Sequence, residues 1–133
     1  MLRLEIVTPE RRVIDTEAES VTVPTASGEA GILTNHAPLI SALKPGILTC
    51  VGKGGSEKLA ISTGFVEVSG NQVSVLTDVA ESAEEVNTEL ARTDREAAER
   101  ELSAASSAAA DQNEGIREKL DLANARLLLA AGR

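Results

Sequence analysis

The chain has 133 residues, 42% of them hydrophobic, which suits one small domain or a small domain with an appendage. Its net charge of −8 and its single aromatic residue, Phe65, argue against nucleic-acid binding, because phosphate contacts need clustered Lys and Arg and single strands need stacking rings. One cysteine excludes an intrachain disulfide, and no apolar run is long enough for a signal peptide or for the roughly 18 residues of a membrane span.

The first 80 residues carry a series of short strand patterns. Alternating apolar and charged residues predict a half-buried strand at 2–6, and apolar or β-branched runs predict strands at 13–14, 20–23, 47–51, 58–62, 65–68 and 73–76. We expect Pro24 to stop the third of these, since proline cannot donate a ladder hydrogen bond. Strands at about 8–12-residue spacing, each followed by a turn signal, predict an antiparallel sandwich or barrel at 1–80.

The segment 23–46 interrupts this series. It holds three of the four prolines, three of the ten glycines and the only histidine. Proline fixes φ and glycine permits positive φ, so the segment is predicted to form tight bends between short strands. We interpret it as the recognition edge of the β-domain.

Residues 81–133 form a second region with helical character. No proline occurs beyond Pro45, and the region carries 7 basic and 12 acidic residues, against 6 and 9 in residues 1–80. Apolar periodicity predicts two antiparallel helices, at about 87–109 and about 113–131, joined by a turn at 111–113. Ser82 and Glu85 have the spacing of a capping box, and Asn87 is an alternative N-cap. The apolar stripe of the first helix is mostly alanine and buries little area, so we expect the helical hairpin to pack only weakly against the β-domain.

Residues that could carry enzyme chemistry are isolated. His36 has no second histidine or nearby cysteine with which to bind a metal, and Cys50 lies in an apolar strand pattern typical of a core residue. The segment 52–56 is rich in glycine but lacks the spacing of a phosphate-binding loop, and no Gly-x-Ser-x-Gly elbow occurs. The sequence therefore predicts no catalytic and no metal site.

Three stretches resemble the epsilon subunit of F-type ATP synthases, and the resemblance covers essentially the whole chain. They are Gly28-Glu29-x-Gly31-Ile32-Leu33-x-x-His36-Ala37-Pro38-Leu39 with Ala42-Leu43-Lys44-Pro45-Gly46, then Gly64-Phe65-Val66-Glu67-Val68, and Asn71-x-Val73-Ser74-Val75-Leu76.

The resemblance implies an α+β fold, in which a flattened β-sandwich precedes an antiparallel two-helix hairpin. It implies a non-catalytic central-stalk subunit that couples proton-driven rotation to ATP synthesis, and whose hairpin inhibits ATP hydrolysis. Its partners would be the gamma subunit, the membrane rotor ring of c subunits, and the alpha and beta subunits. It would lie peripherally on the cytoplasmic face of a bacterial membrane, without inserting into it.

Particular residues inherit roles through the same resemblance. The rotor ring would contact Gly28, Glu29, Ala30 and Gly31, and the loop and strand carrying His36, Pro38, Leu39 and Leu43 would support the gamma contact. The beta subunits would meet Arg92, Arg95, Arg100, Arg117 and Arg126 if the hairpin extends, although each of these arginines also fits a solvated helix face.

One family motif is altered. Some bacterial members bind ATP through Ile/Leu-Asp-x-x-Arg-Ala at the start of the first tail helix, where this chain has Val86-Asn87-Thr88-Glu89-Leu90-Ala91. Asn87 and Leu90 replace the charged pair, so we expect no bound ATP and no other cofactor.

Two further interpretations compete with this one. A small β-sandwich binding module with a helical interaction tail would share the same patterns, but the tail lacks the three or four heptads of a true coiled coil. An enzyme ranks last, because no nucleophile, base or metal constellation is present.

Overall fold

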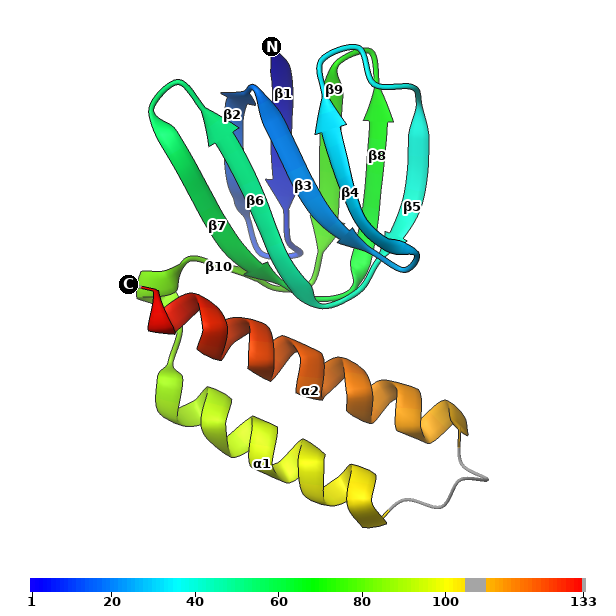
Figure 1. The fold of residues 1–133 in the computed structure, drawn as a ribbon, viewed down its shortest axis with the longest axis vertical. Coiled ribbons are helices and arrows are strands. Elements are labelled where there is room, and N and C mark those ends of the chain that lie inside the picture. Colours follow the sequence, from blue (N-terminus) through cyan, green and yellow to red (C-terminus); the bar gives the residue numbers. More distant parts are fainter. Residues whose placement is uncertain (105–109, 133) are drawn as a thin grey trace.

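The computed structural model describes residues 1–104 and 110–132 (Figure 1). Ten strands form a β-sandwich, and two helices lie side by side across the end of it that is remote from the N-terminus. The predicted α+β fold, with strands first and a helical pair last, is confirmed.

The strands are β1 (Leu2–Val7), β2 (Arg12–Ala18), β3 (Ser20–Thr25), β4 (Gly28–Leu33), β5 (Leu39–Leu43), β6 (Gly46–Gly52), β7 (Gly55–Ile61), β8 (Gly64–Ser69), β9 (Gln72–Thr77) and β10 (Ala80–Glu81). A short 3-10 turn, η1 (Ala83–Glu85), leads into α1 (Thr88–Ala104), and α2 (Ala110–Ala131) is the last element.

The strands follow the order β10-β7-β6-β3-β5-β8-β9-β1-β2, and β4 pairs with β3. All pairings are antiparallel except that of β1 with β9, which is parallel. A single residue pair, Thr25 with Leu43, joins β3 to β5. This one pair joins the strands β10, β7, β6 and β3, with β4, to the strands β5, β8, β9, β1 and β2, which are the two halves of the sandwich.

The core between the halves is almost entirely aliphatic. Along β1 the buried residues Leu2, Leu4 and Ile6 alternate with more exposed ones, as period-two patterning requires. Valines of β3, β8 and β9 belong to the same cluster, together with Leu48 of β6 and Leu59 and Ile61 of β7. Cys50 also lies in this cluster, where burial, and to a lesser degree the charge of Glu57, raises the pKa of its thiol.

The expectation that Pro24 stops its strand is wrong. β3 continues to Thr25, and Pro24 lies opposite Glu29 of β4. β6 pairs only with Ser20–Thr22 of β3, so the missing N–H of Pro24 costs no hydrogen bond between β3 and β6. The carbonyl of Pro24 instead accepts a hydrogen bond of 3.0 Å from the backbone N–H of Lys44.

The turn predicted at 111–113 is also wrong, because α2 already begins at Ala110. Acidic residues are tolerated in the first turn of a helix, where they complement its dipole, so Asp111 is a poor marker of a break. The predicted end of the first helix, 105–109, lies outside the described residues.

Candidate functional site

The edge strand β4 and its hairpin to β3 carry the residues assigned to the rotor ring. Gly28 has a φ of +117°, a left-handed conformation that favours glycine, and its carbonyl accepts a hydrogen bond of 2.5 Å from the hydroxyl of Thr25. β4 pairs with β3, so its other edge is unpaired among the described strands. Glu29 and Gly31 are exposed, whereas Ala30 packs against the core. The hairpin thus presents a backbone edge with one carboxylate.

The loop 34–38, which contains His36, is held at the end of the sandwich remote from the helices. Asn35 and Asn71 both have positive φ, 66° and 63°. The N–H of Asn35 donates to Asn71 Oδ1 at 2.6 Å, and Asn71 Nδ2 donates to Asn35 Oδ1 at 3.3 Å. This reciprocal pair ties the loop to the β8–β9 turn. It connects residues 36 positions apart, so no local pattern signals it.

The outward face of β5, β8 and β9 exposes three large apolar side chains. Ile40, Phe65 and Leu76 are 74%, 61% and 56% exposed. Phe65 and Leu76 lie opposite each other on β8 and β9, and Ala42 lies opposite Phe65 on β5. Beside them runs an open groove of about 780 Å³, to which Val7, Pro9, Thr77 and Glu118 contribute. We call Ile40, Ala42, Phe65 and Leu76 the apolar face.

Sequence reasoning selected the opposite side of β5. Leu43 is 4% exposed and belongs to the core, and Leu39 packs against that core. Alternation along β5 places Ile40 and Ala42 outside, but choosing between the two sides required the register with β8. Leu43 is therefore not accessible at the surface, whereas Leu39 and His36 are half-buried and Pro38 is exposed.

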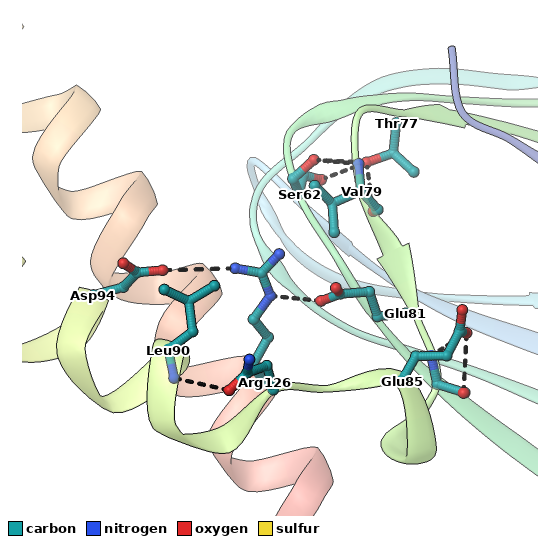
Figure 2. A network of polar contacts seen from close by, with 10 residues as sticks. Ser62, Thr77, Val79, Glu81, Glu85, Leu90, Asp94 and Arg126 are labelled. Carbon is teal, nitrogen blue, oxygen red and sulfur yellow. Dashed lines mark hydrogen bonds and ion pairs between the residues drawn. The ribbon is translucent and has the colours of Figure 1, made fainter. Parts of the chain in front are cut away.

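The sandwich leads into the helices through a buried polar cluster (Figure 2). The N–H of Val79 donates to Ser62 Oγ at 3.0 Å, and the N–H of Ser62 donates to the carbonyl of Val79 at 3.1 Å. The hydroxyl of Thr77 lies 3.1 Å from that of Ser62 and 3.1 Å from the Ser62 carbonyl. These bonds fix the chain just before β10.

The segment 82–87, which we call the hinge, follows β10 and has two capping arrangements. Glu85 accepts hydrogen bonds from the backbone N–H of Ser82 at 3.1 Å and from its hydroxyl at 3.0 Å, and Arg11 Nη2 approaches it at 3.1 Å. The backbone hydrogen bond is the main cause that lowers the pKa of Glu85, and the Ser82 hydroxyl and Arg11 add to it. The capping-box residues thus serve η1 rather than α1.

Asn87 caps α1. Its Oδ1 accepts a hydrogen bond of 3.0 Å from the backbone N–H of Leu90. The side chain of Leu90 is 54% exposed. The two residues that differ from the nucleotide motif are therefore joined to each other by an ordinary helix cap.

The helices dock on the sandwich through α2. Four buried residues make the contact, Ala60, Val86, Ala125 and Leu129, with Ile47, Ala83 and Ala130 at the margin. α2 lies between the sandwich and α1, as Figure 1 shows. Because two of the four buried residues are alanines, the interface contributes only about 3–5 kcal/mol of apolar burial.

The five arginines assigned to the beta subunits have different environments. Arg92, Arg100 and Arg117 are exposed, and Arg95 lies 3.5 Å from Glu99 on the same helix. Arg126 is only 18% exposed: its Nε donates to Glu81 Oε1 at 2.5 Å and its Nη1 lies 4.0 Å from Asp94 Oδ2 (Figure 2). Arg126 thus joins β10, α1 and α2.

Other kinds of site find no support within residues 1–104 and 110–132. No three of their His, Cys, Asp or Glu side chains gather closely enough to hold a metal ion. None of the described helices has both the length and the apolar character needed to cross a membrane.

Known proteins provide an independent comparison. Residues 1–83 match the family model described as ATP synthase, Delta/Epsilon chain, beta-sandwich domain. The ATP synthase epsilon chain of Moorella thermoacetica is 48% identical over 102 residues, which are 76% of each chain, and that of a Synechococcus strain is 37% identical over 130 residues, 98% of this chain and 92% of the relative. A chain of the Euglena gracilis mitochondrial ATP synthase, solved as an OSCP/F1/c-ring assembly, superposes with a TM-score of 0.79 at 25% identity and covers 99% of this chain and 81% of its own.

These matches cover both the sandwich and the helices, and they decide against an unrelated binding module or an enzyme. The chain belongs to the epsilon-subunit family of F-type ATP synthases, as a non-catalytic member.

Proposed function

We propose that this chain is part of the central stalk of an F-type ATP synthase and helps to couple proton-driven rotation to ATP synthesis. The observation that carries the proposal is the match of nearly the whole chain, helices included, to a subunit of an assembly that contains F1 and the c-ring. In such an assembly the protein would lie peripherally, on the cytoplasmic face of a bacterial membrane.

The gamma subunit is the proposed partner of the apolar face. Exposed aliphatic and aromatic side chains on one sheet, rimmed by polar ones, are typical of a protein interface. His36 and Pro38 lie in the loop that leads into β5, so they border the same face. Leu39 and Leu43 hold β5 in place from the core side.

The rotor ring is the proposed partner of the β3–β4 hairpin. Gly28 and Gly31 have no atom within 4 Å of the position that a Cβ would occupy, so a partner could approach the backbone closely at Gly28, Glu29, Ala30 and Gly31. Glu29 would supply the charge that selects a cationic or polar loop.

The hairpin is proposed to act as a regulatory arm that leaves the sandwich and inhibits ATP hydrolysis at the alpha and beta subunits. Its small apolar contact with the sandwich supports this mobility. Arg92, Arg95, Arg100 and Arg117 would meet acidic surface on the beta subunits directly, and Arg126 only after its present ion pairs break.

No ATP binding by this chain is proposed, because Asn87 is engaged as a helix cap and Leu90 offers no charge to a phosphate. Calorimetric titration with ATP tests this, and a dissociation constant at or below about 1 mM, the weak end of measurable affinity, would contradict it.

The decisive experiment is ATP hydrolysis by reconstituted alpha, beta and gamma subunits, titrated with the full chain and with a version truncated after Glu85. This truncation keeps the contact between Arg11 and Glu85. We expect inhibition by the full chain only, while both versions co-elute with gamma. Inhibition by both would refute the role of the hairpin, and failure of both to bind gamma would refute the stalk assignment.

A point substitution tests the apolar face. Phe65→Ser should weaken gamma binding by about tenfold to a hundredfold, as loss of a buried aromatic anchor does. Leu128→Ser is the matched control, because Leu128 is 68% exposed but lies on α2, away from this face. Equal effects of the two substitutions would exclude the apolar face as the gamma contact.

A further inference from the structure

One guanidinium group connects the sandwich to both helices of the hairpin. Arg126 on α2 donates to Glu81 on β10, the last strand of the sandwich, and lies near Asp94 on α1. Both Arg126 and Glu81 are largely shielded from solvent, at 18% and 27% side-chain exposure. Charge-assisted hydrogen bonds are stronger at such partly desolvated sites than on an open surface.

Glu81 is a fixed anchor for this contact. β10 pairs with β7 through Ala80 with Ile61 and Glu81 with Ala60. Two residues upstream, Val79 is bonded in both directions to the buried Ser62. The carboxylate therefore belongs to the rigid sandwich and not to the hinge.

The hinge is held independently of Arg126. Glu85 is bonded to Ser82 and to Arg11 of the β1–β2 connection, and Asn87 caps α1. If the contact of Arg126 breaks, these bonds can persist, so the helices can swing away without unravelling the chain that connects them.

The apolar docking contact cannot compensate for loss of the ion pair. Only Ala125 and Leu129 of α2 are buried in it, together with Val86 and Ala60. Arg126 lies between these two residues of α2 in the sequence, so the polar and apolar contacts form and separate together.

We infer that Glu81, Asp94 and Arg126 form a latch, in which Arg126 holds the hairpin both closed and docked, so that breaking its bond to Glu81 is the step that releases the arm. The inference deepens the proposed regulatory role of the hairpin and rests on it for its biological meaning. The latch itself is a property of the isolated full chain.

Distance measurements between spin labels on the full chain test the latch. Labels at Lys53→Cys and Glu96→Cys, in a Cys50→Ala background, report the separation of the sandwich from α1, because both positions are exposed. Arg126→Gln should lower the ratio of docked to released molecules by about tenfold or more, the effect typical of removing a charge-assisted hydrogen bond. Arg117→Gln, on the same helix but exposed, removes the same charge and should leave the ratio unchanged.

Substitutions of the partners locate the effect. Glu81→Gln leaves Arg126 and Asp94 together, so it should release an intact hairpin with unchanged helical circular dichroism. The double variant Glu81→Gln/Arg126→Gln should show no larger shift than the stronger single variant, because both remove one bond. The exchanged pair Glu81→Arg/Arg126→Glu should restore docking in part. Arg126→Gln behaving like Arg117→Gln, or Glu81→Gln leaving the docked ratio unchanged, would overturn the latch.

Hydrolysis assays separate the latch from the proposed function. With reconstituted alpha, beta and gamma subunits, the Glu81→Gln chain should inhibit at lower concentration than the unsubstituted chain. A released hairpin in the distance measurement without stronger inhibition would refute the regulatory role of the arm and leave the latch standing. Unchanged distances would refute the latch, whatever the inhibition.

Discussion

Among the glycines, Gly64 leaves the least room for a Cβ, and its replacement by alanine gives a sharp test of the packing. A Cβ at this position would lie 1.9 Å from the carbonyl oxygen of Leu76 and 2.9 Å from both the carbonyl carbon of Leu76 and the Cα of Thr77. These are backbone atoms of the paired strand β9, so no side-chain rotation relieves the overlap. β8 and β9 would have to separate locally by about 1 Å, which exceeds what hydrogen-bond geometry tolerates.

The expected loss follows from two contributions. Overpacking costs about 1–3 kcal/mol, and one or two ladder hydrogen bonds near the Gly64–Thr77 pair add about 1 kcal/mol each. The free energy of unfolding should therefore fall by about 2–5 kcal/mol, a large part of the 5–15 kcal/mol that is typical of a domain. The assay is urea unfolding followed by far-ultraviolet circular dichroism, because the chain has no Trp and no Tyr for fluorescence.

Gly115→Ala is the matched control. Gly115 lies in α2 and nothing is within 4 Å of its Cβ position, so the same substitution should stabilise the helix by about 1 kcal/mol. A loss of unfolding free energy in Gly64→Ala and a gain in Gly115→Ala would support the argument that the backbone of β9 leaves no room for a Cβ at Gly64. A Gly64→Ala variant within about 0.5 kcal/mol of the unsubstituted chain, the usual range of a neutral surface change, would refute it.

Three other residues give predictions at the hinge and in the hairpin. The folded-state pKa of Glu85 is lowered, so its contribution to stability is fully present above the unfolded pKa of about 4.3 and is lost as the pH falls through the folded-state pKa. Amide hydrogen exchange in the hinge should therefore become faster below about pH 4 in the unsubstituted chain. In the Glu85→Gln variant the exchange rate should depend less on pH. Asn87→Ala should lower helical stability by about 1 kcal/mol in thermal melts. Asn87→Asp should preserve it, because the side-chain oxygen of Asp caps a helix as that of Asn does. Equal losses in the two variants would contradict the cap. Asn113 Oδ1 is buried with no hydrogen-bond partner among the described residues, so Asn113→Leu should stabilise the hairpin by about 1–2 kcal/mol, while the exposed control Asn124→Leu should not.

The sequence allowed the class of fold and most strands to be predicted, because alternate residues of the runs at 2–6, 47–51 and 73–76 are buried, as a period of two requires. β4 and β5 were not predicted as separate strands, because two glycines in β4 and adjacent apolar residues in both strands, Ile32-Leu33 and Leu39-Ile40, break the alternation. Whether Pro24 ends a strand depends on where the neighbouring β6 stops pairing, and no local pattern contains that information.

The candidate site residues selected from the sequence are those that lie in a motif of neighbouring residues, and their roles stay predictions. The exposed edge around Glu29 and the loop around His36 lie in such a motif. The apolar face depends on the register of paired strands, which the sequence does not show. The environment of Arg126 depends on a contact with Glu81, 45 residues away in the sequence. A helix-face pattern could therefore not distinguish Arg126 from Arg117.

The parallel pairing of β1 with β9 bears on how the protein is made. Arg3–Val7 pair with Gln72–Leu76, so the first strand to leave the ribosome has to wait for one of the last before its ladder is complete. Until then Leu2, Leu4 and Ile6 have no finished core to enter. Contacts this far apart in sequence slow folding and leave apolar surface open to aggregation during synthesis. The sandwich can therefore close only after residue 76 has emerged, and the helices, which follow it in the chain, dock onto a body that is already complete.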